Sequence, residues 1–116
     1  MAMLIQIRGI IGSQELGISA VVLTELLVGA YRGVVEAQRN RHQFIAELTR
    51  DIPVHAYSLE VAELAGRIGG QQAAIGQTIP PVDLMIGAAA LFLGFAILTT
   101  NVRHFRMIPG LFVIPF

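Results

Sequence analysis

The chain has 116 residues, of which 54% are hydrophobic and 14% are charged, and its formal net charge is zero. This length allows one folded domain, spanning residues 1–116, with a single core. The apolar composition excludes a disordered chain, and the absence of cysteine excludes disulfide scaffolds, thiolate zinc sites and cysteine nucleophiles. Because there is no excess of positive charge, any binding to a nucleic acid would depend on local arginines.

The first predicted elements are a short strand and two helices. Residues 18–19 end the strand, and Ser19 is of the type that caps a helix N-terminus. An apolar helix over residues 20–31 and a helix with one polar face over residues 34–50 follow. The start of the chain lacks the features of a secretory signal, so a cytoplasmic location is expected.

Strands and helices alternate along the rest of the chain. The predicted elements are a strand over 52–57, a helix over 59–75 capped by Ser58, a helix over 82–93, a strand over 95–99, a short helix over 102–106 and a strand over 111–114. This alternation predicts an α/β domain with a parallel sheet. Ligands of such sheets bind at the carboxyl ends of the strands.

The stretch from Leu84 to Leu98 is uncharged and almost wholly apolar. It falls short of the roughly 18–20 residues that a membrane-spanning helix needs, and Gly87 and Gly94 interrupt it. A buried helix followed by a buried strand is the better interpretation. A small membrane-associated protein is kept as an alternative because of the high hydropathy.

Two carboxylates stand out as candidate ligands. Asp83 follows Pro80-Pro81 at the start of an apolar helix, where the helix dipole favours a negative charge. Glu25 lies among apolar neighbours and must face solvent, pair with an arginine such as Arg32, or bind a cation. Together they are the material of a site for a hard cation, although either one has an ordinary structural explanation as well.

The segment after the predicted strand 95–99 carries further polar candidates. Thr99 and Asn101 stand at its carboxyl end, where a plain turn is the alternative explanation. The chain's histidines lack metal-ligand spacing and are expected to be structural or exposed, with His104 alone near the predicted site.

Three segments resemble the motifs of the PIN-domain family of VapC-like toxins. Residues 18–30 resemble apolar-S-x-x-T-x-x-E-L-x-x-G, and residues 79–90 resemble a helix that opens with Asp and continues apolar-Ile-Ala-Ala-x-Ala. Residues 98–105 are similar to T-x-N-x-x-x-F, and residues 108–111 follow as a proline–glycine–leucine exit. The resemblance covers residues 18–116 in the family's own order.

The resemblance implies a toxin of a toxin–antitoxin pair, built as a three-layer α/β/α domain around a parallel sheet. Such proteins are Mg²⁺- or Mn²⁺-dependent endoribonucleases that form homodimers and are held inactive by a VapB-like antitoxin. Glu25 and Asp83 would bind the metal, which activates a water, and Asn101 would stand beside it with Thr99 in support. Arg103 and Arg106 are the arginines available for RNA phosphates.

The chain departs from the family pattern in two places. The family begins with a central strand that ends in an aspartate, whereas no Asp precedes Glu25 here, so the residues before Ile18 would correspond to the family's first helix. The strands that flank the missing central strand would then lack hydrogen-bond partners. In addition, Arg103 and His104 stand where many relatives have an acid. A catalytically inactive module that still binds an antitoxin is therefore the alternative function.

Overall fold

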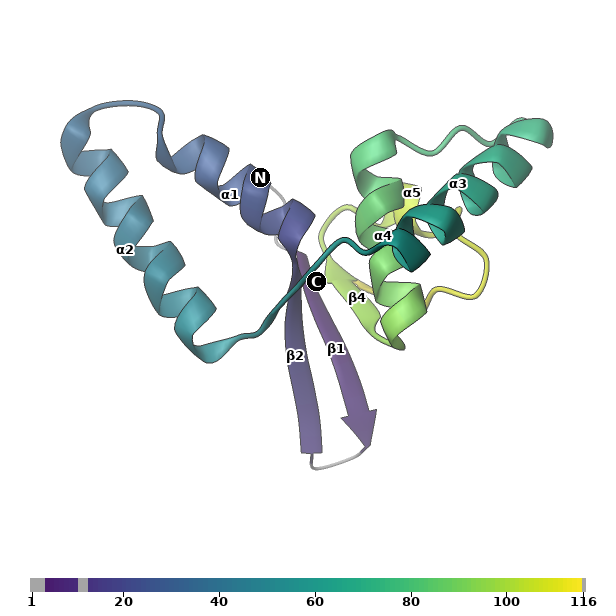
Figure 1. Cartoon of the computed structure of the whole chain (residues 1–116), viewed down its shortest axis with the longest axis horizontal. Coiled ribbons are helices and arrows are strands. Elements are labelled where there is room, and N and C mark those ends of the chain that lie inside the picture. The colour runs from purple at the N-terminus through teal and green to yellow at the C-terminus, as the bar shows by residue number, and fades with distance from the viewer. Residues whose placement is uncertain (1–3, 11–12, 116) are drawn as a thin grey trace.

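A computed structural model describes residues 4–10 and 13–115, and expectations for residues 1–3, 11, 12 and 116 lie outside it. The elements in chain order are β1 (Leu4–Ile10), β2 (Ser13–Ser19), α1 (Ala20–Ala30), α2 (Val35–Asp51), β3 (Val54–His55), α3 (Leu59–Ala74), α4 (Pro81–Leu93), β4 (Ala96–Thr99), α5 (Val102–Phe105) and β5 (Val113–Pro115). Figure 1 shows the β1–β2 hairpin between the α1–α2 pair and the α3–α4 pair.

The helices begin where the capping residues predict. The side chain of Ser19 accepts a hydrogen bond from the Val21 N–H at 3.2 Å, and that of Ser58 accepts one from the Val61 N–H at 3.2 Å. Each serine thus satisfies a backbone donor that the first turn leaves without a helical partner. The predicted starts of α1 and α3 are confirmed.

Helix α4 and strand β4 divide the apolar stretch as predicted. Pro81 takes the first helical position, where its missing N–H costs no hydrogen bond. Gly94 ends the helix with a φ of 76°, and the Phe95 N–H then donates to the Ala90 carbonyl at 2.8 Å. Across residues 4–10 and 13–115, none of the helices is long and apolar enough to cross a membrane.

The sheet differs from the predicted all-parallel one. Its strand order is β3-β2-β1-β4-β5, in which β2 is parallel to β3, β4 is parallel to β5, and β1 is antiparallel to both β2 and β4. Four strands therefore share one direction and the central strand opposes them. Because β1 and β2 are joined by a short connection, they can pair only as an antiparallel hairpin.

Strand β1 fills the central position of the sheet, so two expectations were wrong. Residues 4–10 and 13–17 form strands rather than the family's first helix, and the neighbours of the central strand keep their hydrogen-bond partners. Because β1 runs in the opposite direction, its first residue, Leu4, lies in register with Thr99 at the carboxyl end of β4. The family resemblance places an aspartate of the central strand at this edge of the sheet. In this chain the residue of the central strand at that edge is Leu4.

Two strands are shorter than their apolar runs suggest. The strand predicted over 52–57 is reduced to Val54–His55, which pairs with Ile18 and Ser19. It can extend no further along β2, because the chain turns into α1 after Ser19. The last strand starts at Val113 rather than at residue 111, although the Phe112 carbonyl already accepts a hydrogen bond from the Ile97 N–H at 2.9 Å.

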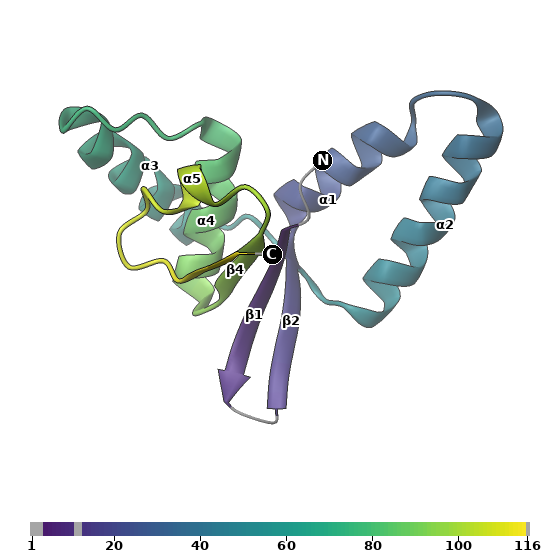
Figure 2. The same ribbon diagram turned by 180° about the vertical axis from the view of Figure 1, so that it is seen from behind.

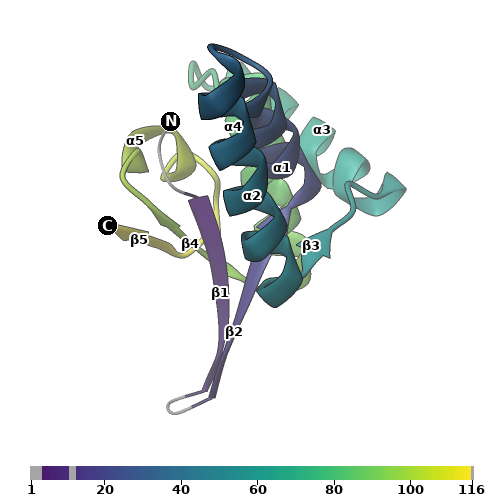
Figure 3. The same ribbon diagram turned by 90° about the vertical axis from the view of Figure 1, so that its left-hand side faces the viewer.

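The core lies between the sheet and helix α4. Its fully buried side chains include Ile18, Ile86, Ile97 and Phe105. Figure 2 shows α5 over α4 and α2 on the opposite side of the hairpin, and Figure 3 shows β5 beside β4. The carboxyl ends of β2 and β4, the start of α4 and the short α5 all belong to this same packed unit, and they position the candidate site.

Candidate functional site at the start of helix α4

Asp83 lies in the first turn of α4, as the sequence predicts. The N-terminal turn leaves backbone N–H groups unpaired and carries partial positive charge, which stabilises a carboxylate there. The side chain of Asp83 is 19% exposed, so one part of it meets solvent and the rest meets the protein.

The partner of Asp83 is His104. The His104 Nδ1 lies 2.8 Å from the Asp83 Oδ2, and the histidine side chain is 29% exposed. An ionised carboxylate only accepts hydrogen bonds, so Nδ1 carries the proton and donates it. Sequence reasoning left His104 as a structural or exposed residue. Its place in the segment where relatives carry an acid was the signal that could have revealed this pairing.

Helix α5 is held against α4 by residues next to His104. Phe105 is 1% exposed and Ile108 is 2% exposed. Both lie close to Gly87 on α4, where a β-carbon would meet the Ile108, Leu111 and Phe105 side chains. The small size of residue 87 thus allows the segment after β4 to approach the helix. This packing sets the distance between His104 and Asp83.

The turn between β4 and α5 is organised by Thr99. Thr99 is fully buried, and its Oγ1 accepts a hydrogen bond from the Asn101 N–H at 3.0 Å. Asn101 itself is exposed at the start of α5, and its side chain caps no backbone group. The turn therefore presents the Asn101 amide to solvent on the segment that also carries His104.

Glu25 lies on α1 and is half-buried. It stands three and four residues after Val22 and Val21, which pack against the core, so it flanks the buried face of the helix. Among the described residues it forms neither a hydrogen bond nor an ion pair, and the pairing with Arg32 is absent. No hydrogen bond among the described residues joins it to Asp83, although its helix packs against α4.

Arg103 and Arg106 are both exposed, at α5 and immediately after it. Neither guanidinium forms an ion pair with a described residue. Two positive groups therefore stand on the same short segment as His104, while the whole chain is neutral.

The other two histidines lie outside this region. The ring of His42 packs edge-on against Tyr31 at 4.4 Å between centroids, and that of His55 packs against Phe95 at 5.0 Å. Their surroundings agree with the structural roles that the sequence predicts for them.

The described side chains do not, as arranged, form a site for a cation. Mg²⁺ binds one or two carboxylates and keeps several waters. Here an Asp83 oxygen already accepts the His104 N–H, and within residues 4–10 and 13–115 no three His, Asp or Glu side chains are grouped to hold a metal. The central strand contributes Leu4 to this edge instead of a carboxylate.

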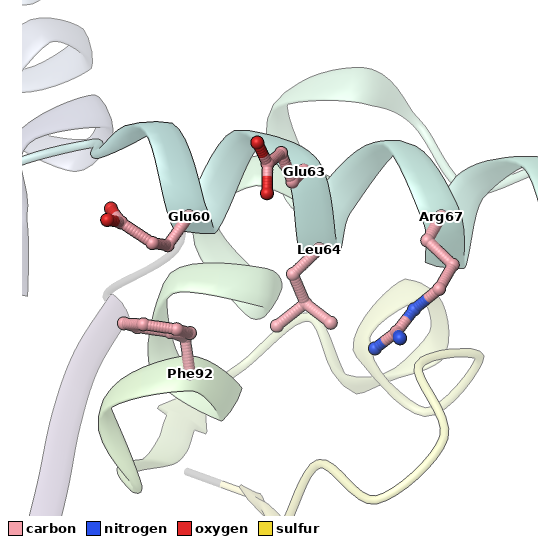
Figure 4. Close-up of a pocket in the computed structure, with 5 residues that line it drawn as sticks. All are labelled: Glu60, Glu63, Leu64, Arg67 and Phe92. Atoms are coloured by element: carbon pink, nitrogen blue, oxygen red, sulfur yellow. The ribbon is translucent and has the colours of Figure 1, made fainter.

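A cavity of about 410 Å³ lies elsewhere, between α3 and the end of α4. It is lined by Glu60, Glu63, Leu64, Arg67 and Phe92 (Figure 4). In Figure 4, Leu64 and Arg67 extend downward from α3, and Phe92 extends upward from α4. Glu63 points away from Phe92. None of the predicted site residues contributes to this cavity, so it is separate from the region around Asp83.

The PIN domain family matches residues 4–111. The chain belongs to this family. It is 30% identical to the tRNA(fMet)-specific endonuclease VapC of Salmonella typhimurium over 101 residues, which are 87% of this chain and 75% of that protein. It is 33% identical to ribonuclease VapC1 of Rickettsia felis over 98 residues, covering 84% of this chain and 73% of that protein.

The fold also resembles solved VapC proteins. The structure of VapBC-1 from nontypeable Haemophilus influenzae superposes with a TM-score of 0.79 and 25% sequence identity, over 87% of this chain and 74% of that chain. The PIN-type α/β architecture predicted from the motifs is thereby confirmed. The antiparallel central strand is a feature of this chain's own strand pairing.

Proposed function

We propose that this PIN domain is an endoribonuclease toxin of a VapBC-type pair that acts in the cytoplasm. The observation that carries the proposal is the family match over residues 4–111, with Asp83 held at the start of α4 beside the Thr99–Arg106 segment. The relatives named above are ribonucleases, and the matched structure is a VapBC complex.

Arg103 and Arg106 bind the RNA. Arginine donates paired hydrogen bonds to phosphate oxygens, and both guanidinium groups are exposed and without an ionic partner among the described residues. Because the chain is neutral overall, these local charges and not a global field attract the substrate. Asn101 adds an exposed amide that can contact the sugar or phosphate next to Asp83.

The proposed cofactor is Mg²⁺ or Mn²⁺. Asp83 and Glu25 are the carboxylates that would bind it, after Asp83 has left His104. A bound divalent cation supplies an activated water and stabilises negative charge on the phosphate. The residues of the chain contribute binding: Asp83 provides the anionic oxygen, and Thr99 holds the Asn101 turn in place.

The proposed antitoxin covers the α1–α2 pair. The large exposed apolar side chains of the α1–α2 pair and its connection are Val28, Tyr31, Val34, Val35 and Phe44, with exposures between 51% and 73%. Apolar side chains on a helical pair are the usual receptor for an amphipathic helix of a partner. A small protein encoded beside this chain should co-purify with it, and Tyr31→Asp should weaken that association while Leu59→Asp on α3 leaves it intact.

A homodimer is proposed through α3 and the end of α4. Leu59 is 72% exposed and Phe92 is 50% exposed, and both lie at the end of α3–α4 that holds the 410 Å³ cavity. Glu60 and Glu63 precede Arg67 along α3, so two antiparallel copies of the helix can pair acid with base in both directions. Light scattering should show a dimer that Phe92→Asp converts to a monomer, whereas Phe44→Asp does not.

The second candidate is an inactive module that binds only the antitoxin. The Asp83–His104 pairing and the Leu4 position favour it, because together they leave the region short of carboxylates. RNA cleavage decides between the candidates.

The deciding experiment measures cleavage of RNA by the purified protein with Mn²⁺. Cleavage that is lost in both Asp83→Asn and Glu25→Gln supports the enzyme. Asp51→Asn is the matched control, because Asp51 is an exposed acid on α2 whose one ion pair among the described residues is with its neighbour Arg50. Absence of cleavage in the unmodified protein would contradict the proposal and favour the inactive module, whereas full cleavage by Asp83→Asn would remove Asp83 from the proposed site.

A further inference from the structure

Gln72, in the last turn of α3, connects three segments of the chain through one side-chain amide. Its Nε2 donates a hydrogen bond to the Met107 carbonyl at 2.9 Å and another to the Gln77 Oε1 at 3.0 Å. Met107 follows α5, and Gln77 lies in the connection between α3 and α4. The bond to Met107 spans 35 positions of the sequence, so it is a tertiary contact rather than part of the end of α3.

The connection between α3 and α4 fixes the direction of this amide. The Gln72 carbonyl accepts the Gln77 N–H at 2.8 Å, which brings Gln77 back to the last turn of α3. Because a carbonyl oxygen only accepts hydrogen bonds, the Gln72 side chain must turn its NH₂ group, with two donors, toward both oxygens. Both donors are thereby satisfied, and the side chain has one preferred orientation.

Met107 carries this restraint to the arginine that precedes it. The Met107 N–H donates to the His104 carbonyl at 3.1 Å, and Gln72 holds the Met107 carbonyl. On the other side, the Arg106 N–H donates to the Val102 carbonyl at 3.1 Å. Hydrogen bonds thus fix the backbone before and after Arg106, whereas its exposed side chain forms no ion pair with a described residue.

From these contacts we infer that Gln72 is a positioning residue for RNA: it holds the backbone of Arg106 so that the guanidinium is preorganised for a phosphate. The inference rests on the proposed function, which assigns Arg106 to RNA. A binding group on a rigid backbone has less conformational freedom to lose when a ligand orders it, and binding is tighter by that difference. Gln72 contacts no RNA itself and acts through Met107.

A purely structural role of Gln72 is the alternative. A tie between α3 and the turn after α5 also stabilises the fold, and its loss would then affect RNA binding independently of Arg106. The two roles differ in their energetic coupling, because the effects of residues that act on one contact are non-additive, whereas those of independent residues add. The coupling between Gln72 and Arg106 in RNA affinity therefore distinguishes them.

The test is the dissociation constant of the full chain for a fluorescein-labelled single-stranded RNA of mixed sequence, measured by fluorescence anisotropy in EDTA. Gln72→Met keeps the length of the side chain and lacks both donors, so it should weaken binding about threefold to tenfold. Gln71→Met is the matched control, because Gln71 is exposed in the same turn and forms no hydrogen bond among the described residues. It should change the affinity by less than about twofold.

A double-mutant cycle with Arg106→Ala measures the coupling. Arg106→Ala should weaken RNA binding by itself, and the addition of Gln72→Met should then change the affinity by less than about twofold. Gln77→Met is a milder second variant, since it removes only the acceptor that orients the Gln72 amide and leaves the bond to Met107. It should weaken binding less than Gln72→Met does and should also lose its effect without Arg106.

The inference is overturned if Gln72→Met binds RNA as tightly as the unmodified protein, or if it causes the same loss with and without Arg106. In both cases a weakened Arg106→Ala would leave the proposed RNA contact standing. If Arg106→Ala binds RNA as the unmodified protein does, the proposed contact fails together with the inference. The two failures are therefore distinguishable.

Discussion

The two helical pairs on either side of the hairpin are built very differently. In α4, all residues from Ile86 to Ala90 are buried, whereas α2 has 17 residues and buries Ile45 alone. The α3–α4 pair closes over the sheet with small side chains that permit close packing, while the α1–α2 pair attaches to the core mainly through Val22 and a few flanking residues. The α3–α4 pair supplies stability and holds Asp83, whereas the α1–α2 pair presents surface and carries Glu25.

The comparison explains where the apolar excess of the chain goes. Part of it is buried around α4, and part is displayed on the α1–α2 pair, where contiguous apolar surface indicates an interaction site. Identical kinds of substitution in the two pairs should therefore have different consequences for the free energy of unfolding.

The largest difference is expected for phenylalanine. Phe105→Ala should lower the free energy of unfolding by about 3–5 kcal/mol, because a fully buried ring is lost and a cavity remains. Phe44→Ala, at a ring that is 51% exposed on α2, should cost less than about 1 kcal/mol. Urea denaturation monitored by circular dichroism measures both. Equal losses would show that α2 is packed far more tightly than its exposure indicates.

A glycine-to-alanine substitution should destabilise the protein in the α3–α4 pair and stabilise it in the α1–α2 pair. At Gly87 the new methyl group meets the buried Ile108, Leu111 and Phe105 side chains, and overpacking should cost roughly 1–3 kcal/mol. At Gly29 on α1 the added methyl group would meet no described atom outside its own stretch of helix within 4 Å, so Gly29→Ala should stabilise by about 0.5–1 kcal/mol through helix propensity. The melting temperatures of the two variants, compared with that of the unmodified protein, measure both effects. Stabilisation by Gly87→Ala would mean that the Ile108 side chain moves aside without loss.

The helix caps give a smaller contrast of the same kind. Ser58→Ala removes the side-chain acceptor for the Val61 N–H and should destabilise α3 by about 1 kcal/mol. Val34, at the corresponding position of α2, caps nothing, and Val34→Ser should add up to about 1 kcal/mol. The midpoints of urea unfolding should move in opposite directions. A shift of both in one direction would disprove the capping assignment.

The smallest effect concerns the connection between α1 and α2. The Arg41 Nη1 donates to the Arg32 carbonyl at 2.7 Å and to the Gly29 carbonyl at 3.2 Å, which stabilises the end of α1. Arg41→Ala should cost about 0.5–1 kcal/mol, since the group is exposed. Hydrogen exchange should speed up in α1 and α2 and stay unchanged in α4, with Arg39→Ala as the control. Equal acceleration in α4 would show that the two pairs unfold together.

Local chemistry in the sequence determined most element boundaries. Ser19, Ser58, Pro81 and Gly94 act through hydrogen bonds and φ angles within a few residues of themselves, so their effects can be predicted without knowing the fold. The position of Asp83 in a first helical turn follows from the same rules. The family motifs added the order of the elements and the expected sites of chemistry.

Tertiary structure alone decided how strands and side chains from distant segments meet. The pairing of β1 with β4, the pairing of β3 with the end of β2, and the hydrogen bond from His104 to Asp83 join residues far apart in sequence. Hydrophobic periodicity reports which face of an element is buried, but it carries no information about the neighbour that covers that face. A strand accepts an antiparallel neighbour as readily as a parallel one, and a carboxylate accepts a histidine as readily as a cation, so the partner in each case was set by the packing of the whole chain.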